Sequence, residues 1–479
     1  MSADAPKLTR VLGLPGLTFF LVAALVNLNS IPVVSGIGPA ALLFWIAGFL
    51  LFFLPQAVAV AELSSRFPQE GGIYNWNKTA FGGFHGFISG WCYWTNNIFY
   101  IPTLLFYIVG FAAFVGGEPV SALGTNATLM AGASLVLLWV IVVLNILGLR
   151  FASWVQAAGA TGTFLTAVAM MVVGLIAFRQ HGMANAFELP AMLSAFTDWK
   201  TLSLLSVVCL NYVGLELGSV IGEEIKEPRR NIPRAILIAG ASTVLLYVAA
   251  TVALEASIPA SDIGVIDGIL QGVRRTASSI GLPWLLQPVA LLMSLNAAGN
   301  ASAWLAGSAR IPFVIGIDRY LPAAFGRVHP RFHTPHVSLV VQGFASSLFI
   351  AINAVGATVT DMYMILLQTT VILQLIPYLY MFLALIVIRR YPERHASGQG
   401  YFHSATPVYA SGILGFVVTV AGMVLAFIPT QAVSDVWNFE FKTGLGVLSF
   451  LVPAFVLYAV KARRRRAALV SPPVEVAPD

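Results

Sequence analysis

Long apolar segments, separated by short polar connections, run through the chain from end to end. A helix needs about 20 predominantly apolar residues to cross the hydrocarbon of a bilayer. Twelve stretches approach or exceed that length, so we predict twelve spans and a short surface helix within the polar stretch 259–282. The predicted spans are residues 12–35, 38–64, 84–115, 124–147, 152–178, 201–222, 235–258, 284–313, 336–356, 360–388, 407–428 and 443–461.

Composition excludes the other broad classes of protein. Hydrophobic residues make up 58% of the chain and charged residues only 10%, whereas a soluble domain carries roughly 25% charged residues. A disordered chain would be polar and poor in aromatic residues, and a membrane β-barrel would show short alternating segments. The chain is therefore predicted to be an all-α polytopic membrane protein with the lipid bilayer as its surroundings.

The positions of lysine and arginine set the predicted topology. With the N-terminus in the cytoplasm, 21 of the 26 basic residues fall on the cytoplasmic side, as the positive-inside rule requires. We therefore expect a multi-pass protein of the cytoplasmic (inner) membrane with both termini inside, and we read the net charge of +6 as topology, not as a nucleic-acid signal. The expected parts are a tail at 1–11, a transmembrane domain at 12–461 and a basic, proline-rich tail at 462–479, disordered from Ala467.

Two spans contain residues that interrupt a helix. The first carries Asn27, Asn29 and Ser30 just before Pro32, and the sixth carries Asn211, Gly214 and Glu216 at mid-span. Because backbone polar groups in hydrocarbon must be satisfied within the protein, such residues either kink a helix or mark a functional break. The spans divide into repeats at about 12–178 and 201–388, followed by two extra helices at about 407–461. The breaks then occupy corresponding positions, which favours a 5+5 inverted repeat with binding at the midplane.

The chemistry of paired breaks suits a small zwitterion. Unwound backbone offers amide groups to a carboxylate and carbonyl groups to an ammonium. Glu216 is the only acid that we place deep in a span, where a charge is expensive and usually functional. Its predicted role is gating or proton coupling, and the alternative is a structural tether between helices.

Four sequence motifs, in order along the chain, resemble the amino acid/polyamine/organocation transporter superfamily. The first is the acid-to-double-glycine loop from Glu62 to Gly72. The second is Gly214-Leu215-Glu216, followed by the segment from Glu223 to Arg234, which contains two prolines. The others are Gly307–Arg310 with its following loop, and Leu375–Tyr378. The resemblance covers about residues 12 to 461 and implies a LeuT-like fold with broken helices 1 and 6. It also implies a secondary active amino acid permease that works by alternating access.

The resemblance also implies a set of site residues. The third helix offers Trp91, Trp94, Asn96 and Tyr100, and aromatic residues with polar tips suit a gated pocket wall. The alternative for any single asparagine is an interhelical hydrogen bond. The expected substrate-binding residues are Asn27, Asn29, Ser30, Tyr93, Asn97, Asn211, Tyr212, Gly214, Glu216, Asn296 and Asn300, and the expected gating or coupling residues are Glu216, Tyr212 and Trp304.

Several positions depart from the family pattern. Most members carry a Gly-Ser-Gly run in the first break, whereas the Asn/Ser version with Pro32 looks closer to bacterial glutamate/GABA antiporters and plant polyamine transporters. Thr163 stands where many proton-coupled members carry a lysine in the fifth helix. Leu210 stands where a gating aromatic is usual, and Tyr212 is the nearby replacement.

The predicted pocket is rich in asparagine and nearly uncharged, which favours a neutral zwitterionic amino acid. Polyamines, cationic amino acids and acidic amino acids are the alternatives. Coupling is expected to be proton symport or exchange, and sodium stays open because Ser294, Ser302 and Ser308 lie on the eighth span. A membrane-embedded enzyme would need a nucleophile–base set or metal ligands, and a channel would need a charged ring or filter. We find neither pattern, and we expect no cofactor and no metal.

Overall fold

The computed structural model describes residues 10–69, 71–116, 127–264, 267–318, 320–353, 359–394, 398–429 and 436–470. Within these ranges the chain is helical and forms no strand; a single backbone bridge joins Leu12 to Ile225. The first half contains α1 (Leu14–Leu25), α2 (Ile31–Ser35), α3 (Ala40–Gly48), α4 (Leu54–Arg66), α5 (Gly72–Phe81), α6 (Gly83–Val115), α7 (Ala127–Ile146), α8 (Leu149–His181) and α9 (Leu189–Ser194). The second half contains α10 (Trp199–Leu202), α11 (Leu204–Asn211), α12 (Leu217–Val220), α13 (Pro228–Ser257), α14 (Gly268–Ser279), α15 (Leu286–Ser308), α16 (Arg310–Ile317), α17 (His336–Asn353), α18 (Val359–Arg390), α19 (Thr406–Leu425) and α20 (Val436–Val470).

The all-α polytopic prediction is confirmed. Ten helical segments in the described part are long and apolar enough to cross a membrane. The two further spans expected from the sequence are the sixth, which is divided between α11 and α12, and the ninth, whose apolar helix His336–Ala351 is shorter. The predicted surface helix is α14. Helix α20 continues to Val470, so the expected disorder does not begin at Ala467. The tail residues 1–9 and 471–479 lie outside the described residues.

Both predicted helix breaks are present. Helix α1 ends at Leu25, and Val26 turns to extended backbone before a 3₁₀ turn at Leu28–Ser30 leads into α2. Helix α11 ends at Asn211, and the chain does not resume a helix until Leu217. Gly214 in this gap has φ of +130°, which only glycine adopts readily. Pro32 lies in the first turn of α2, where its missing N–H has no helical partner to lose. Local sequence therefore determines both breaks.

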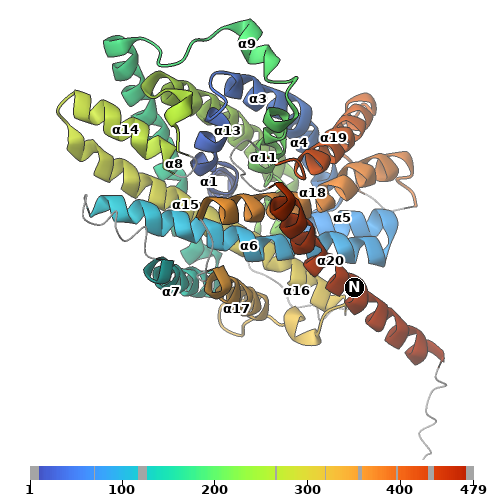
Figure 1. Cartoon of the computed structure of the whole chain (residues 1–479). Coiled ribbons are helices and arrows are strands. Elements are labelled where there is room, and N and C mark those ends of the chain that lie inside the picture. Colours follow the sequence, from blue (N-terminus) through green and yellow to red (C-terminus); the bar gives the residue numbers. More distant parts are fainter. Residues whose placement is uncertain are drawn as a thin grey trace, which may run out of the picture.

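The broken first helix lies at the centre of the bundle. The segment Leu14–Ser35 is 89% buried in its most apolar stretch, against 17% for Phe439–Lys461. Helix α1 packs on α8, α13 and α15, and α15 packs along α6 and α8. Figure 1 shows α6 and α15 side by side across the middle of the molecule, with α19 at one edge and α20 running across the near face and past the bundle. A substrate at the breaks would therefore contact the repeats and not the two extra helices.

One end of the bundle is closed by buried arginines, and we call it the arginine end (Arg66, Arg310 and Arg389). Glu62 Oε1 lies 2.8 Å from Arg66 Nη2 and 3.2 Å from Arg389 Nη1. These contacts join the ends of α4 and α18. Arg310 Nη2 lies 2.5 Å from Glu224 Oε1, which joins α15 and α16 to the segment after α12. Because every partner is largely buried, separation of these helix ends would leave charges unpaired in a low-dielectric interior.

Candidate functional site

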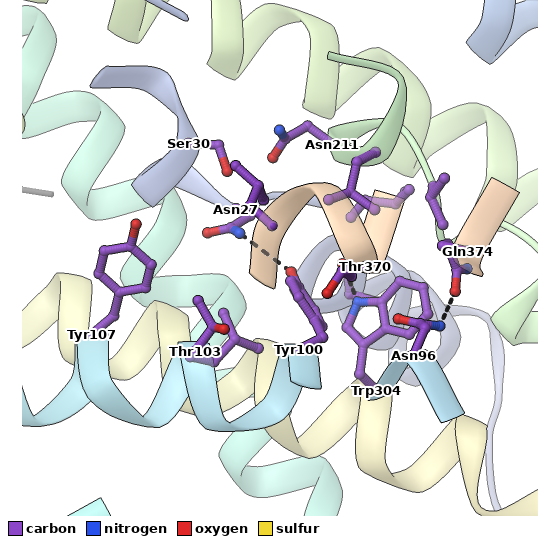
Figure 2. Close-up of a pocket in the computed structure, with 16 residues that line it drawn as sticks. Asn27, Ser30, Asn96, Tyr100, Thr103, Tyr107, Asn211, Trp304, Thr370 and Gln374 are labelled. Atoms are coloured by element: carbon purple, nitrogen blue, oxygen red, sulfur yellow. Dashed lines mark hydrogen bonds between the residues drawn. The ribbon is translucent and has the colours of Figure 1, made fainter. Parts of the chain in front are cut away.

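A small cavity lies where the two breaks face α6, α15 and α18 (Figure 2). Its volume is about 20 Å³, which is room for about one water molecule, so side chains must move before an amino acid can enter. Its lining mixes amides, hydroxyls and aromatic rings, and no charged side chain is among the described residues that line it. They are Ala24, Leu25, Asn27, Ser30, Asn96, Tyr100, Thr103, Leu104, Tyr107, Leu210, Asn211, Val213, Trp304, Leu367, Thr370 and Gln374.

The structure brings part of the predicted site to this cavity. The expected residues that line it are Asn27, Ser30, Asn96, Tyr100, Asn211 and Trp304. Sequence reasoning missed Thr103 and Tyr107 on α6, and Thr370 and Gln374 on α18. A signal existed for the second pair, because two polar residues four apart in an apolar span share one face of the helix.

Asn27 forms the first-helix wall of the cavity. Its Nδ2 donates to the Tyr100 hydroxyl at 3.2 Å, and Tyr100 donates to Asn300 Oδ1 at 3.1 Å. Its backbone N–H donates to the Tyr247 hydroxyl at 3.0 Å. The remaining atom, Asn27 Oδ1, is buried and has no hydrogen-bond partner among the described residues. A donor group on a ligand would satisfy it.

The carbonyl end of α1 is capped by side chains from α15. Asn300 Nδ2 donates to the carbonyls of Ala23 and Ala24 at 2.9 and 3.0 Å, and Trp304 Nε1 donates to Ala24 at 3.0 Å. Asn296 Nδ2 donates to Val26 O at 2.9 Å and to Thr163 Oγ1 at 2.5 Å. Asn296 and Asn300 thus lie behind the cavity as tethers of the first break. These carbonyls, which we expected to be open to an ammonium, already have donors.

Glu216 lies beside the cavity and holds the sixth break together. Its Oε1 accepts from the Tyr93 hydroxyl at 2.7 Å, and its Oε2 accepts from the Tyr378 hydroxyl, from Gln56 Nε2 at 3.3 Å and from Gly214 N–H at 3.2 Å. The carboxyl is fully buried and is not among the cavity-lining groups. It therefore connects α4, α6 and α18 to the break, and a change in its charge would reach all of them.

The remaining predicted residues lie away from the cavity. The Tyr212 hydroxyl donates to Trp45 O at 2.9 Å, and the Tyr212 ring packs edge-on against Trp45. Asn97 Nδ2 donates back to Tyr93 O at 2.9 Å. Asn29 is buried, and neither polar atom of its side chain has a partner in the described part of the chain. Gly214 and Tyr93 do not line the cavity; they donate hydrogen bonds to the Glu216 carboxyl beside it.

Glu216 is not the only buried carboxyl on a predicted span. Glu255 is also fully buried, but it lies near the end of α13 and not deep in a span. Neither of its carboxylate oxygens has a hydrogen-bond partner among the described residues. Glu255 lies in the predicted span 235–258, and the sequence reasoning overlooked it because no helix breaker marks it.

A family model described as amino acid permease matches residues 12–450. The chain belongs to this family. The resemblance drawn from the four motifs is confirmed, and this permease is a multi-pass membrane transporter of small amines or amino acids, not an enzyme.

Curated relatives extend along nearly the whole chain. An uncharacterized transporter of Legionella pneumophila is 29% identical over 93% of this chain and 96% of the relative. A probable agmatine/putrescine antiporter of Lactococcus lactis is 23% identical over 88% of each chain. A glutamate/gamma-aminobutyrate antiporter of Lactococcus lactis is 24% identical over 88% of this chain and 85% of the relative.

Proposed function

We propose that this permease moves a neutral zwitterionic amino acid across the cytoplasmic membrane by alternating access. The observation that supports this proposal is the uncharged lining of the cavity. A polyamine or cationic side chain would bring charge into a buried site without an acid on its wall, and an acidic side chain would lack a base. Burial of an unpaired charge costs several kcal/mol, by order of magnitude.

The α-amino and α-carboxylate groups of such a substrate carry opposite charges and can partly compensate each other. Asn27 Oδ1 is the unpartnered acceptor on the first break and suits the ammonium group. The neighbouring hydroxyls and amides supply donors for the carboxylate. We assign Trp304 as a gating residue because its indole lies on the cavity wall and is fixed to Ala24 by its N–H.

The direction of access follows from the proposed topology. We place the arginine end in the cytoplasm, because the positive-inside rule puts basic helix ends there. Helix α6 starts at Gly83, at the arginine end. The cavity reaches Thr103 and Tyr107, which lie in the other half of this helix, away from the arginine end. This geometry fits a state sealed toward the cytoplasm, and release inside requires the ion pairs of Glu62 and Glu224 to part.

Coupling by proton symport or by exchange completes the proposal. Glu216 is the candidate proton site, because it is the buried carboxyl that joins the sixth break to three other helices. Exchange needs no proton, because alternation is then driven by the second amino acid. Sodium coupling stays the alternative, because buried oxygens without a hydrogen-bond partner among the described residues, Asn27 Oδ1 and Asn29 Oδ1, lie at the first break.

Counterflow into proteoliposomes tests the substrate class. Vesicles are preloaded with one unlabelled compound at a time, and entry of the labelled form is followed. We expect counterflow with a neutral amino acid such as alanine; counterflow only with ornithine, putrescine or glutamate would overturn the neutral class. Trp304→Ala should abolish the signal, whereas Trp154→Ala, whose ring is 76% exposed on α8, should retain it.

A further inference from the structure

A pair of buried amides occupies the side of the cavity opposite Asn27. Asn96 on α6 and Gln374 on α18 are 2% and 1% exposed, and Asn96 Nδ2 donates to Gln374 Oε1. Figure 2 shows this bond at the far side of the Trp304 indole from Asn27. Both residues line the cavity; Asn96 was expected in the pocket wall, and Gln374 was not expected at the site.

The donors of Asn96 are used, but those of Gln374 are not. Asn96 Nδ2 uses its two hydrogens on Tyr93 O, at 3.0 Å, and on Gln374. Gln374 Nε2 is buried and makes no hydrogen bond of normal geometry with the described residues, although it interacts with the Tyr378 hydroxyl one turn along α18. A buried amide N–H₂ without an acceptor is unfavourable, because no hydrogen bond compensates for the loss of its contacts with water. The cavity thus presents an unsatisfied donor at Gln374 and an unsatisfied acceptor at Asn27, on opposite sides.

These two atoms require different ligand groups. Asn27 Oδ1 needs a donor, which the α-ammonium of the proposed substrate supplies. Gln374 Nε2 needs an acceptor, and the hydroxyl of Thr370 lies one turn earlier on the same helix and lines the same cavity. A carboxylate side chain would supply an acceptor but would bring a charge that no described lining group neutralises. An alkyl side chain would leave the amide unsatisfied.

We infer that the permease selects substrates whose side chain ends in an uncharged hydrogen-bonding group, with a carboxamide preferred, and that Asn96 and Gln374 read that group. A carboxamide offers a carbonyl acceptor to Gln374 Nε2 and an N–H₂ donor to the Thr370 hydroxyl. This inference rests on the proposed function, because it assumes that a neutral amino acid occupies the cavity.

The position of the pair also connects it to the gate. Gln374 precedes Tyr378 by one turn of α18, and Asn96 follows Tyr93 by about one turn of α6. Tyr93 and Tyr378 are the two hydroxyls that bind Glu216. A ligand group that pulls on Asn96 and Gln374 would therefore act on the same two helices that clamp the sixth break. Selection and gating would share one structural element.

Competition against counterflow of a labelled neutral amino acid tests the inference. Asparagine and leucine have side chains of nearly the same shape, as do glutamine and methionine, so each pair isolates the amide. In each pair, the amide should inhibit the wild-type protein at a concentration about tenfold or more below the concentration that the apolar amino acid needs. The reason is that a site built for hydrogen bonds rejects analogues without them. Aspartate and glutamate should compete least.

Substitution then assigns the preference to the pair. Gln374→Met should reduce the preference for glutamine over methionine, measured as the ratio of their inhibitory concentrations, about tenfold or more. Asn96→Leu should reduce the preference in the same direction. Gln368→Met is the matched control: Gln368 is a buried glutamine on the same helix, bonded to Ser206 at 3.3 Å and absent from the cavity lining. That variant should keep the wild-type ratio.

The outcomes separate this inference from the proposed function. Counterflow with neutral amino acids but equal inhibition by asparagine and leucine overturns the amide selectivity and leaves the transport proposal standing. A Gln374→Met protein that loses affinity equally for every ligand also overturns it. Absence of counterflow with any neutral amino acid overturns the proposed function. If neither variant of the pair folds, the wild-type competition decides alone.

Discussion

The hydroxyl of Tyr247 lies 3.0 Å from the backbone nitrogen of Asn27 and 3.2 Å from the carbonyl oxygen of Asn211. One side chain of α13 therefore touches both broken helices, at the residues where their helical hydrogen bonding stops. The same hydroxyl is 2.9 Å from Leu25 O. Because the backbone at a break has no helical partner, this oxygen replaces bonds that an unbroken helix would make for itself.

Removal of this hydroxyl should loosen both breaks. Tyr247→Phe leaves the Asn27 N–H without its acceptor, so we expect a loss of about 1–3 kcal/mol in the free energy of unfolding together with slower counterflow. Tyr212→Phe is the control, because the Tyr212 hydroxyl donates to Trp45 O and Tyr212 is not among the residues that line the cavity. Thermal unfolding in detergent and counterflow rates measure the two effects. If Tyr247→Phe transports as fast as Tyr212→Phe, the contact is structural only.

Glu216 should control the pH dependence of transport. In Glu216→Gln the amide can still accept from Tyr93 or Tyr378, but it carries no charge and cannot exchange a proton. We expect a folded protein whose transport is abolished or no longer changes with pH between about 5 and 8, where buried carboxyls can titrate. Glu255→Gln is the matched control, because that carboxyl is equally buried and has no described partner. A wild-type rate and pH profile in Glu216→Gln would remove Glu216 from the coupling mechanism.

Sequence predicted the breaks well because their cause is local. Asn, Gly and Pro inside apolar segments are visible without any knowledge of packing, and the structure has both breaks where those residues lie. The cavity was predicted only in part, because its lining depends on which face of each helix turns inward. Asn296 and Asn300 share a stripe with Trp304, yet the two asparagines reach behind the first break while the indole lines the cavity.

The omission of Gln374 has a similar cause. Its motif neighbours Leu375–Tyr378 drew attention as a family match, and the polar residues just before them carried no family signal. Only the packing of α18 against α6 brings Gln374 to Asn96. Long-range pairs of this kind require the three-dimensional arrangement, because sequence patterns report one helix at a time.

The arginine end should depend on complete ion pairs. Arg310→Met leaves Glu224 buried without its cation, so we expect about 3–5 kcal/mol of destabilisation. The double variant Arg310→Met, Glu224→Leu removes both charges and should recover much of that loss, as replacement of a whole buried pair often does. Chemical or thermal unfolding of the three proteins gives the comparison. A double variant no more stable than Arg310→Met would show that the helix ends are held by other contacts.

Helices α8 and α15 approach each other at two glycines. A methyl group added to Gly159 would lie 2.5 Å from the Cα of Gly299, and one added to Gly299 would lie 2.6 Å from the Cα of Gly159. Small residues at such crossings let membrane helices pack closely. Because the clash is with backbone, the helices must separate, and Gly159→Ala should lower the free energy of unfolding by about 1–3 kcal/mol.

Separation of α8 from α15 would also displace Asn296, which bridges Thr163 on α8 and Val26 at the first break. Counterflow should therefore fall with stability in Gly159→Ala. Gly132→Ala on α7 is the matched control: a methyl group added there would have no atom of the described residues within 4 Å, and alanine favours helix by up to about 1 kcal/mol over glycine. Equal melting temperatures for the two variants would mean that the crossing tolerates a wider spacing and that the position of Asn296 does not depend on it.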